Sequence, residues 1–222
     1  MTPAPPARAA TATLDHLVVA ASTLADGIDF IGHVTGVTPV PGGRHVAMGT
    51  HNALLRLGDR VYLEIIAIDP DGAKPARPRW FGLDRVALQS DLTERPRLVH
   101  WVARTDDIDA AAAACGIALG PVQAMARGDY RWRITIPDDG ALPGNGVLPT
   151  LIQWDVAQHP AEGLPRSPVT LAQLAATHPD AATVRATLAA LGLGEAIHVT
   201  YDGETRLAAM LRTPRGFVTL SS

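Results

Sequence analysis

Four polar side chains with metal-binding chemistry recur at corresponding places along the sequence. His16 and His100 each lie in a short apolar run typical of a β-strand, and Glu64 and Gln153 lie in later runs of the same kind. A carboxylate in the apolar run 61–66 must be paired or face a wet cavity, because an unpaired buried charge is very unfavourable. Two neutral imidazoles, a carboxylate and an amide oxygen suit a divalent ion such as Zn, Ni, Fe(II), Mn or Co. We therefore predict a metal site if folding brings the four side chains together.

The elements that would position these residues follow a pattern that occurs three times. Each copy predicts a strand, a helix and three further strands, because an apolar, β-branched run precedes a helical stretch that ends at a glycine. The expected strands are 14–19, one around Val40, 53–57 and 61–68, then 99–102, 122–126, 130–136 and 148–154, then 170–176, 197–201, 206–212 and 217–220. The expected helices are 24–31, 106–115 and 181–191.

These copies predict three βαβββ modules, at residues 12–70, 97–157 and 168–222. One helix covers a single face of a four-stranded sheet, so two modules must curl against each other to bury the other face. The expected fold is α+β, a half-open mixed β-barrel with helices outside and a third module without metal ligands. The proline-rich stretches 70–78 and 159–168 are predicted to be linkers. Because the third module lacks a partner module, we expect it to pack on a second copy in a homodimer.

The order of these motifs resembles that of the vicinal oxygen chelate superfamily, whose founding enzyme is glyoxalase I, and within it the glyoxalase-like domain proteins. The resemblance covers roughly residues 12 to 157 and is carried by LDHLV at 14–18, GTHNAL at 49–54, YLEII at 62–66 and LIQWD at 151–155. It implies that the metal ligands are His16, Glu64, His100 and Gln153. Glyoxalase I has a glutamate where this chain has Gln153, which cannot ionise. The catalytic base would then be Glu64 or a metal-bound hydroxide.

Two kinds of function follow from this resemblance. The first is a divalent-metal-dependent enzyme of the isomerase, lyase or dioxygenase type that acts on a small molecule with two neighbouring oxygen atoms. Its metal would stabilise the negative charge that develops on oxygen. The second is a non-catalytic protein that binds and sequesters a drug or metabolite, as bleomycin resistance proteins do. Bound metal that is lost in a His16→Ala/His100→Ala variant would favour the enzyme.

Several further side chains are candidates for the wall of the cavity. Tyr62, Trp101 and Trp132 are aromatic residues in predicted strands, and Asn52 stands at the entry to another strand. His45, His159, His178 and His198 lie in loop or edge contexts and are expected to face solvent.

Composition narrows the classes of partner. The chain has 222 residues and a net charge of -3, which argues against nucleic acid, because phosphate binding requires a clustered positive surface. The sequence lacks an apolar run long enough for a membrane span and a secretory signal pattern at its start. The single Cys115 excludes an internal disulfide. These features predict a cytoplasmic protein that acts on a small molecule.

Overall fold

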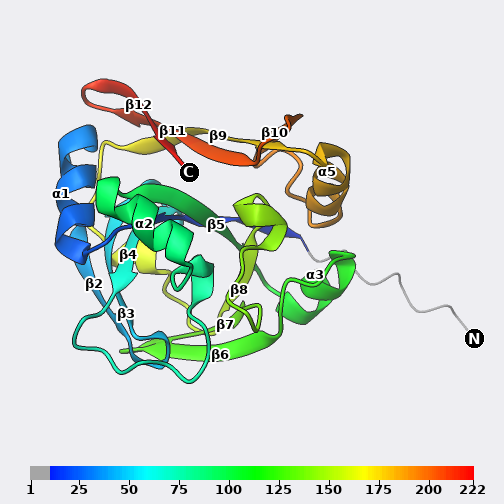
Figure 1. The fold of residues 1–222 in the computed structure, drawn as a ribbon, viewed down its shortest axis with the longest axis horizontal. Coiled ribbons are helices and arrows are strands. Elements are labelled where there is room, and N and C mark those ends of the chain that lie inside the picture. Colours follow the sequence, from blue (N-terminus) through cyan, green and yellow to red (C-terminus); the bar gives the residue numbers. More distant parts are fainter. Residues whose placement is uncertain (1–10) are drawn as a thin grey trace, which may run out of the picture.

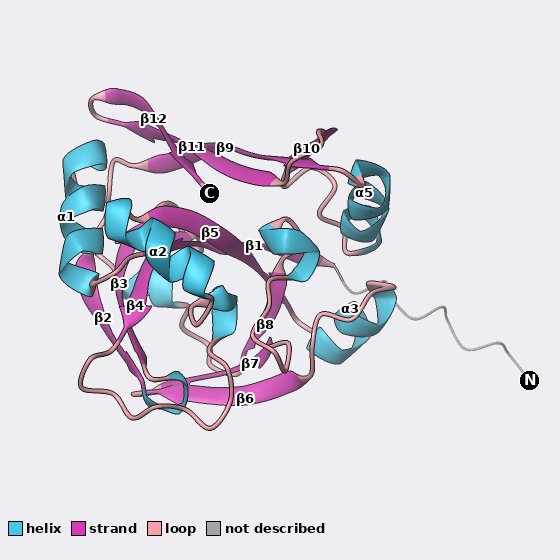
Figure 2. Cartoon of the chain, viewed as in Figure 1, coloured by secondary structure: helices cyan, strands magenta, loops and turns pink. Residues whose placement is uncertain are grey.

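The computed structural model describes residues 11–222, which form three successive groups of one strand, one helix and three further strands (Figures 1 and 2). The first group consists of β1 (Ala12–Ala20), α1 (Leu24–Thr35), β2 (Val40–His45), β3 (Thr50–Arg56) and β4 (Tyr62–Ile68). The second consists of β5 (Arg97–Thr105), α3 (Ile108–Ala114), β6 (Val122–Arg127), β7 (Tyr130–Thr135) and β8 (Thr150–Trp154). The third consists of β9 (Thr170–His178), α5 (Ala181–Ala190), β10 (His198–Tyr201), β11 (Arg206–Thr213) and β12 (Gly216–Ser221). The connections contain α2 (Val86–Glu94), α4 (Pro160–Gly163) and the single turns η1 (Val46–Met48), η2 (Trp80–Gly82) and η3 (Pro143–Gly146).

The first two groups share one eight-stranded sheet, in the order β2-β3-β4-β1-β5-β8-β7-β6. This sheet curls into a nearly closed barrel, with α1 and α3 on its outer side (Figure 1). The third group forms a separate sheet in the order β10-β9-β11-β12. The α+β class and the half-open barrel with helices outside, predicted from the sequence, are confirmed.

The two halves of the barrel repeat the same strand pairing. In each half the first strand pairs in parallel with the last, β1 with β4 and β5 with β8, and β1 joins β5 antiparallel at the seam between the halves. Across this seam Val18 lies opposite His100, and His16 lies opposite Val102. The seam therefore brings the first strands of both halves side by side.

Helix boundaries follow from local chemistry. The hydroxyl of Thr23 accepts a hydrogen bond from Asp26 N at the start of α1, and Gly36, with φ of 74°, ends that helix. The carboxylate of Asp107 accepts from Ala110 N at the start of α3. A Cβ on Gly27 of α1 would lie 2.4 Å from Cγ2 of Ile65, so the missing side chain lets the helix lie close to β4. The helices are thereby fixed against the outer face of the barrel.

A β-bulge interrupts the pairing of β1 with β5. Leu14 pairs with Ala103 and His16 with Val102, which leaves Asp15 as an extra residue on β1. A bulge breaks the alternation of side chains between the two faces of a strand and bends the backbone. The side chains of Asp15 and His16 can therefore contact each other, although strict alternation would place them on opposite faces of the strand.

The third module covers the outer face of the seam between β1 and β5, as Figure 1 shows for its sheet above β5. Leu17 and Trp101 on that face share one apolar core with Leu174, Ala209 and Leu211 of the third module. One face of the third sheet is thus covered inside the chain, which removes the reason given above for a second copy. A homodimer stays a prediction.

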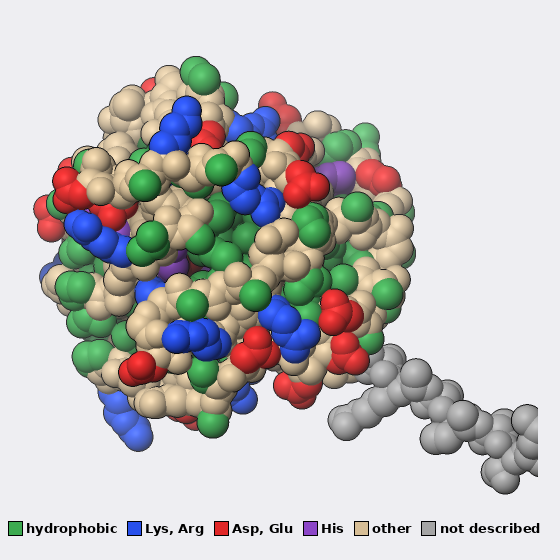
Figure 3. All heavy atoms as spheres, turned by 90° about the horizontal axis from the view of Figure 1, so that it is seen from below, with side chains coloured by type: hydrophobic (Ala, Val, Ile, Leu, Met, Phe, Trp, Pro, Cys, Tyr) green, Lys and Arg blue, Asp and Glu red, His purple; other side chains and the backbone are tan. Residues whose placement is uncertain are grey.

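The stretches predicted to be linkers carry structure that matters below. Residues 70–78 lead into η2 and α2, and His159 starts the single turn α4. Within residues 11–222, no helix combines the length and apolarity that a membrane span needs. On the face seen in Figure 3, Lys and Arg side chains are interspersed with Asp and Glu.

Candidate functional site

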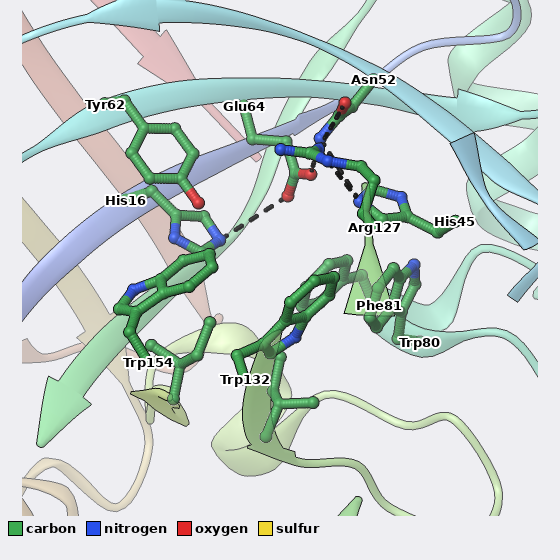
Figure 4. A pocket seen from close by; sticks show the side chains of 12 residues that line it. His16, His45, Asn52, Tyr62, Glu64, Trp80, Phe81, Arg127, Trp132 and Trp154 are labelled. Atoms are coloured by element: carbon green, nitrogen blue, oxygen red, sulfur yellow. Dashed lines mark hydrogen bonds and ion pairs between the residues drawn. The ribbon is translucent and has the colours of Figure 1, made fainter. Parts of the chain in front are cut away.

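A pocket lies inside the curved sheet, on the face opposite the third module. Its polar side chains gather along one wall and its indole and phenyl rings along the other (Figure 4). The lining residues are His16, His45, Asn52, Tyr62, Glu64, Trp80, Phe81, Arg127, Trp132, Ile134, Ile152 and Trp154. Strands from both halves of the barrel and η2 contribute to this set, so the pocket exists only when the halves curl together.

His16 is held in one orientation by its neighbour Asp15. Nδ1 of His16 lies 2.6 Å from Oδ1 of Asp15, and both side chains are buried. A buried carboxylate accepts hydrogen bonds, so Nδ1 carries the proton and Nε2 is the atom that remains for chemistry. Nε2 lies 3.6 Å from Oε2 of Glu64, and the ring stacks on Tyr62 with centroids 4.5 Å apart.

Asp15 is in turn held by Trp154 at the end of β8 and by His159 at the start of α4. Its Oδ2 accepts from Nε1 of Trp154 and from Nε2 of His159, each at 2.9 Å. Nδ1 of His159 accepts from the backbone nitrogen of Ala161, which places the proton of that ring on Nε2. Burial alone would raise the pKa of Asp15, but the bonds from His159 and His16 and their attraction outweigh it, and the pKa lies well below its usual range. Asp15 is therefore a permanent carboxylate that fixes the imidazole of His16.

A second chain of contacts runs from Glu64 to the opposite end of the wall. Oε1 of Glu64 accepts from Nδ2 of Asn52 at 2.6 Å, and Oδ1 of Asn52 accepts from Nη1 of Arg127 at 2.9 Å. Nη1 of Arg127 also lies 3.3 Å from Nε2 of His45. Asn52 therefore orients the carboxyl group of Glu64 and leaves Oε2 facing His16.

Two groups in this wall keep an uncharged form. Burial, with the positive charge of Arg127 nearby, lowers the pKa of His45 to about 3, so this imidazole is neutral. Burial, with the negative charges of Asp15 and Glu64 nearby, raises the pKa of Tyr62 well above its usual range. Tyr62 therefore offers a neutral hydroxyl that can donate a hydrogen bond into the pocket.

The structure does not bring His100 and Gln153 to this pocket. Nε2 of His100 accepts from the backbone nitrogen of Thr150 at 3.0 Å, and its Nδ1 lies 3.3 Å from the carbonyl oxygen of Gly146. Burial lowers the pKa of His100 to about 3. Gln153 lies on the outer face of β8, where its Oε1 accepts from the backbone nitrogen of Ile108 at the start of α3. Both side chains stabilise the fold.

The strand register explains the misplacement of Gln153. In the first half Glu64 lies opposite Val18, two residues after His16, and in the second half Thr150 lies opposite Val102, two residues after His100. Thr150 is therefore the counterpart of Glu64, and its Oγ1 lies 3.0 Å from Nε2 of His100. Gln153 is three positions further on, and an odd shift moves a side chain to the other face of a strand.

The predicted wall residues divide in a similar way. Asn52, Tyr62 and Trp132 line the pocket. Trp101 does not, because it points to the outer face of β5, where it is fully buried and its Nε1 donates to the carbonyl oxygen of Val147 at 2.8 Å. Alternation along β5 separates Trp101 from its inward-facing neighbours.

The turn η2 fills the half of the barrel next to His100. The Phe81 ring lies 5.6 Å from the ring of His100 and stacks on Trp80 at 5.3 Å. Phe81 has φ of 57°, a conformation that a bulky residue keeps only when its surroundings enforce it. The ion pair between Arg79 and Asp84, at 2.7 Å, braces this turn. The segment that follows the proline-rich stretch 70–78 therefore closes one side of the pocket.

The donor set does not fit the predicted divalent metal. Glyoxalase-like proteins generally bind divalent metals, but here His16 and Glu64 are the only two of the four expected ligands that face each other. The Nε2 lone pair of His100 and the amide oxygen of Gln153 already accept backbone hydrogen bonds. Across the described part of the chain, no cluster of three His, Cys, Asp or Glu side chains could hold an ion. We therefore derive no chemistry through a metal.

Sequence reasoning missed several residues of the site. Asp15 carried the same signal as Glu64, a carboxylate in an apolar run, but strict alternation assigned it to the other face of its strand. His45 and His159 were expected in solvent, whereas both are buried. Arg127 ends β6 and reaches the site only because that strand approaches β2. No local pattern in the sequence reports such an approach.

The paired βαβββ modules and the pocket between them define a class of proteins that bind small molecules inside a curled sheet. The glyoxalase-like domain family matches residues 14–192, and the chain belongs to this family. Its paired modules have the vicinal oxygen chelate fold, as the sequence resemblance predicted.

Several solved structures are similar to this chain. A hypothetical protein from Staphylococcus aureus is 14% identical, with a TM-score of 0.54, over 94% of this chain and 84% of that one. Methylmalonyl-CoA epimerase from Streptomyces coelicolor is 21% identical, with a TM-score of 0.43, over 68% of this chain and 99% of that one. The epimerase from Mycobacterium tuberculosis is 19% identical, with a TM-score of 0.40, over 65% and 88%. No curated protein matches the chain.

Proposed function

We propose that the protein is an enzyme that moves a proton at a carbon atom next to a carbonyl group of a small molecule. The observation that carries the proposal is the position of Nε2 of His16, fixed by Asp15 and 3.6 Å from Oε2 of Glu64 inside the pocket. An isomerase or a lyase of this kind requires one group that accepts a proton and one that donates a proton, both facing the same small volume.

The residues divide the reaction between them. The carboxylate of Glu64 takes a proton from the carbon, and the electron pair of the C–H bond moves toward the carbonyl oxygen to give an enolate. The neutral hydroxyl of Tyr62 donates a hydrogen bond to that oxygen, where negative charge develops. His16, when it carries a proton on Nε2, returns a proton to the intermediate. Return to the carbon gives an isomer, and transfer to a departing group gives elimination.

Of the predicted reaction types, this site favours isomerase or lyase chemistry over a dioxygenase. A dioxygenase of the predicted kind needs an iron held by two histidines and a carboxylate. Here the second histidine of that set, His100, already accepts the backbone hydrogen bond of Thr150. Proton transfer, in contrast, needs only His16 and Glu64, which lie together.

Hydrogen exchange tests the proposal without knowledge of the natural substrate. The purified protein is incubated in D₂O with 2,3-pentanedione and with 2-oxobutanoate, and loss of the CH₂ proton signal is followed by NMR. We expect protein-dependent exchange that falls at least about 100-fold in Glu64→Gln and in His16→Gln. Gln153→Asn, outside the pocket, is the matched control and should exchange at the wild-type rate.

Two outcomes would contradict the proposal. Exchange that persists in Glu64→Gln would assign the base elsewhere. Saturable binding of these compounds with no exchange in the wild type would favour the sequestering protein considered from the sequence.

A further inference from the structure

We propose that Arg127 binds a carboxylate group of the substrate, which makes small organic acids the substrate class of this pocket. This inference rests on the proposed function, since it names what the acid–base pair acts on. A guanidinium group and a carboxylate form two parallel N–H···O bonds, which fix both the position and the orientation of the acid.

Arg127 is an arginine in the pocket wall without an acidic partner. Across residues 11–222, no carboxylate lies within ion-pair distance of its guanidinium group, whereas Arg79 pairs with Asp84 and Arg133 with Asp155. Its neighbours in the site are instead the neutral imidazole of His45 and the amide of Asn52. The positive charge of Arg127 is therefore available to an anionic ligand.

The hydrogen bonds of Arg127 leave one edge of the guanidinium group unused. Both protons of Nη1 have acceptors, Oδ1 of Asn52 at 2.9 Å and Nε2 of His45 at 3.3 Å. In the part of the chain that the structure describes, Nε and Nη2 have no acceptor. These two atoms form the edge that binds a carboxylate through two parallel bonds. The group is thus fixed from one side and open from the other.

Asn52 keeps this arginine apart from the base. Its Nδ2 donates to Glu64 and its Oδ1 accepts from Arg127, so a single amide separates the two charges. In the view of Figure 4 the guanidinium group lies between the Glu64 carboxyl group and the His45 ring. A direct ion pair between Arg127 and Glu64 would occupy both the carboxylate that acts as the base and the free edge of the guanidinium group. With the amide between them, an acid bound to Arg127 presents its neighbouring carbon atoms to Glu64.

The backbone of β2 makes room for this arrangement. A Cβ on Gly43 would lie 3.0 Å from Cδ of Arg127, and a Cβ on Gly42 would lie 2.2 Å from Oδ1 of Asn52. Gly43 also has φ of 154°, which side chains rarely adopt. The two glycines therefore let Arg127 cross from β6 and contact Asn52 over the strand.

The test compares acids with their uncharged amides. Binding of 2-oxobutanoate and benzoylformate, and of the two matching amides, is measured by calorimetry with the Glu64→Gln protein and with Glu64→Gln combined with Arg127→Gln. We expect the acids to bind more tightly than the amides, and the Arg127→Gln change to weaken acid binding about 10- to 100-fold while amide binding changes less than about two-fold. Arg131→Gln, beside the site and outside the pocket wall, is the control and should alter neither.

Three results would overturn the inference. These are equal loss of acid and amide binding in the Arg127→Gln background, equal affinity of acid and amide for the parent protein, and no binding of either acid up to about 10 mM, above the usual range of KM. Thermal unfolding of each variant excludes loss of the fold as the cause.

Failure of this inference is distinguishable from failure of the proposed function. Arg127-dependent binding of acids by a wild type that exchanges no protons supports the carboxylate subsite and rejects the enzyme. Proton exchange of a neutral diketone and an acid with equal efficiency, unaffected by Arg127→Gln, supports the enzyme and rejects the subsite.

Discussion

Nδ1 of His16 lies 2.6 Å from Oδ1 of Asp15, its immediate neighbour in the chain. The β-bulge at Asp15 makes this contact possible, because two neighbours in a regular strand face opposite sides. With Nδ1 held by Asp15, Nε2 of His16 points toward Glu64. A one-residue irregularity in a strand is thus the origin of the proposed acid–base pair.

Replacement of Asp15 by asparagine should damage both stability and activity. The carboxylate accepts hydrogen bonds from His16, Trp154 and His159, and an amide cannot accept all three in the same geometry. We expect the free energy of unfolding in urea to fall by about 2–4 kcal/mol and proton exchange to fall at least about 10-fold. Asp155→Asn, which breaks a part-exposed pair with Arg133, should cost less than about 1 kcal/mol. Equal effects of the two changes would contradict the role of Asp15.

The protein should become less stable as the pH is lowered, because His45 and His100 are neutral in the folded protein. Burial holds the pKa of each at about 3, so below about pH 6.5 the unfolded chain takes up protons that the folded chain does not. Between pH 7 and pH 5 His100 alone should cost about 2 kcal/mol. Urea unfolding of His100→Gln should show a shallower pH dependence than the wild type. An unchanged slope would show that His100 already carries a proton when folded.

Metal should contribute little to the stability or activity of this protein, because the four expected ligands do not lie together in one site. After treatment with a chelator we expect Tm and proton exchange to stay unchanged, and added Zn, Ni, Fe, Mn or Co to raise neither. Thermal unfolding and the NMR exchange assay measure these two effects, and metal analysis measures the bound metal. Stoichiometric metal that disappears in the His16→Ala/His100→Ala variant would contradict this account and restore the metal site predicted from the sequence.

Gln153 should matter for the fold alone. Its amide oxygen accepts from the backbone nitrogen of Ile108 at the start of α3, a group that otherwise has no partner within the helix. Gln153→Ala should lower the free energy of unfolding by about 1 kcal/mol. The variant's exchange rate should equal that of the wild type, and a large loss of exchange without loss of stability would place Gln153 in the site.

The strands and helices could be predicted well from the sequence because each is marked by a local pattern of residues. The strands and helices of all three modules lie within a few residues of the expected ranges, since apolar alternation and glycine stops mark them. The turn η2 and the helix α2 were missed. The Trp80 and Phe81 positions lie after a proline-rich stretch with no periodic pattern, and the left-handed conformation of Phe81 depends on tertiary contacts.

The expected placement agrees with the structure for His16 and Glu64 and differs from it for His100 and Gln153. His16 and Glu64 belong to adjacent parallel strands, so alternation alone placed them together. The partner of His100 depended on the register between β5 and β8, and an error of three residues exchanged Thr150 for Gln153. Register between strands distant in the chain is set by the folded sheet, so a single sequence does not report it.

The tautomer of His16 is the most direct test of the central claim, and it needs no substrate. Two-bond ¹H–¹⁵N NMR spectra, assigned with a His16→Gln variant, report which ring nitrogen carries the proton. The account predicts that Nδ1 of His16 carries a proton that it shares with Asp15, and that this preference is lost in Asp15→Asn. A spectrum in which Nδ1 loses its proton while Nε2 keeps one would contradict the role of Asp15 and with it the proposed acid–base pair.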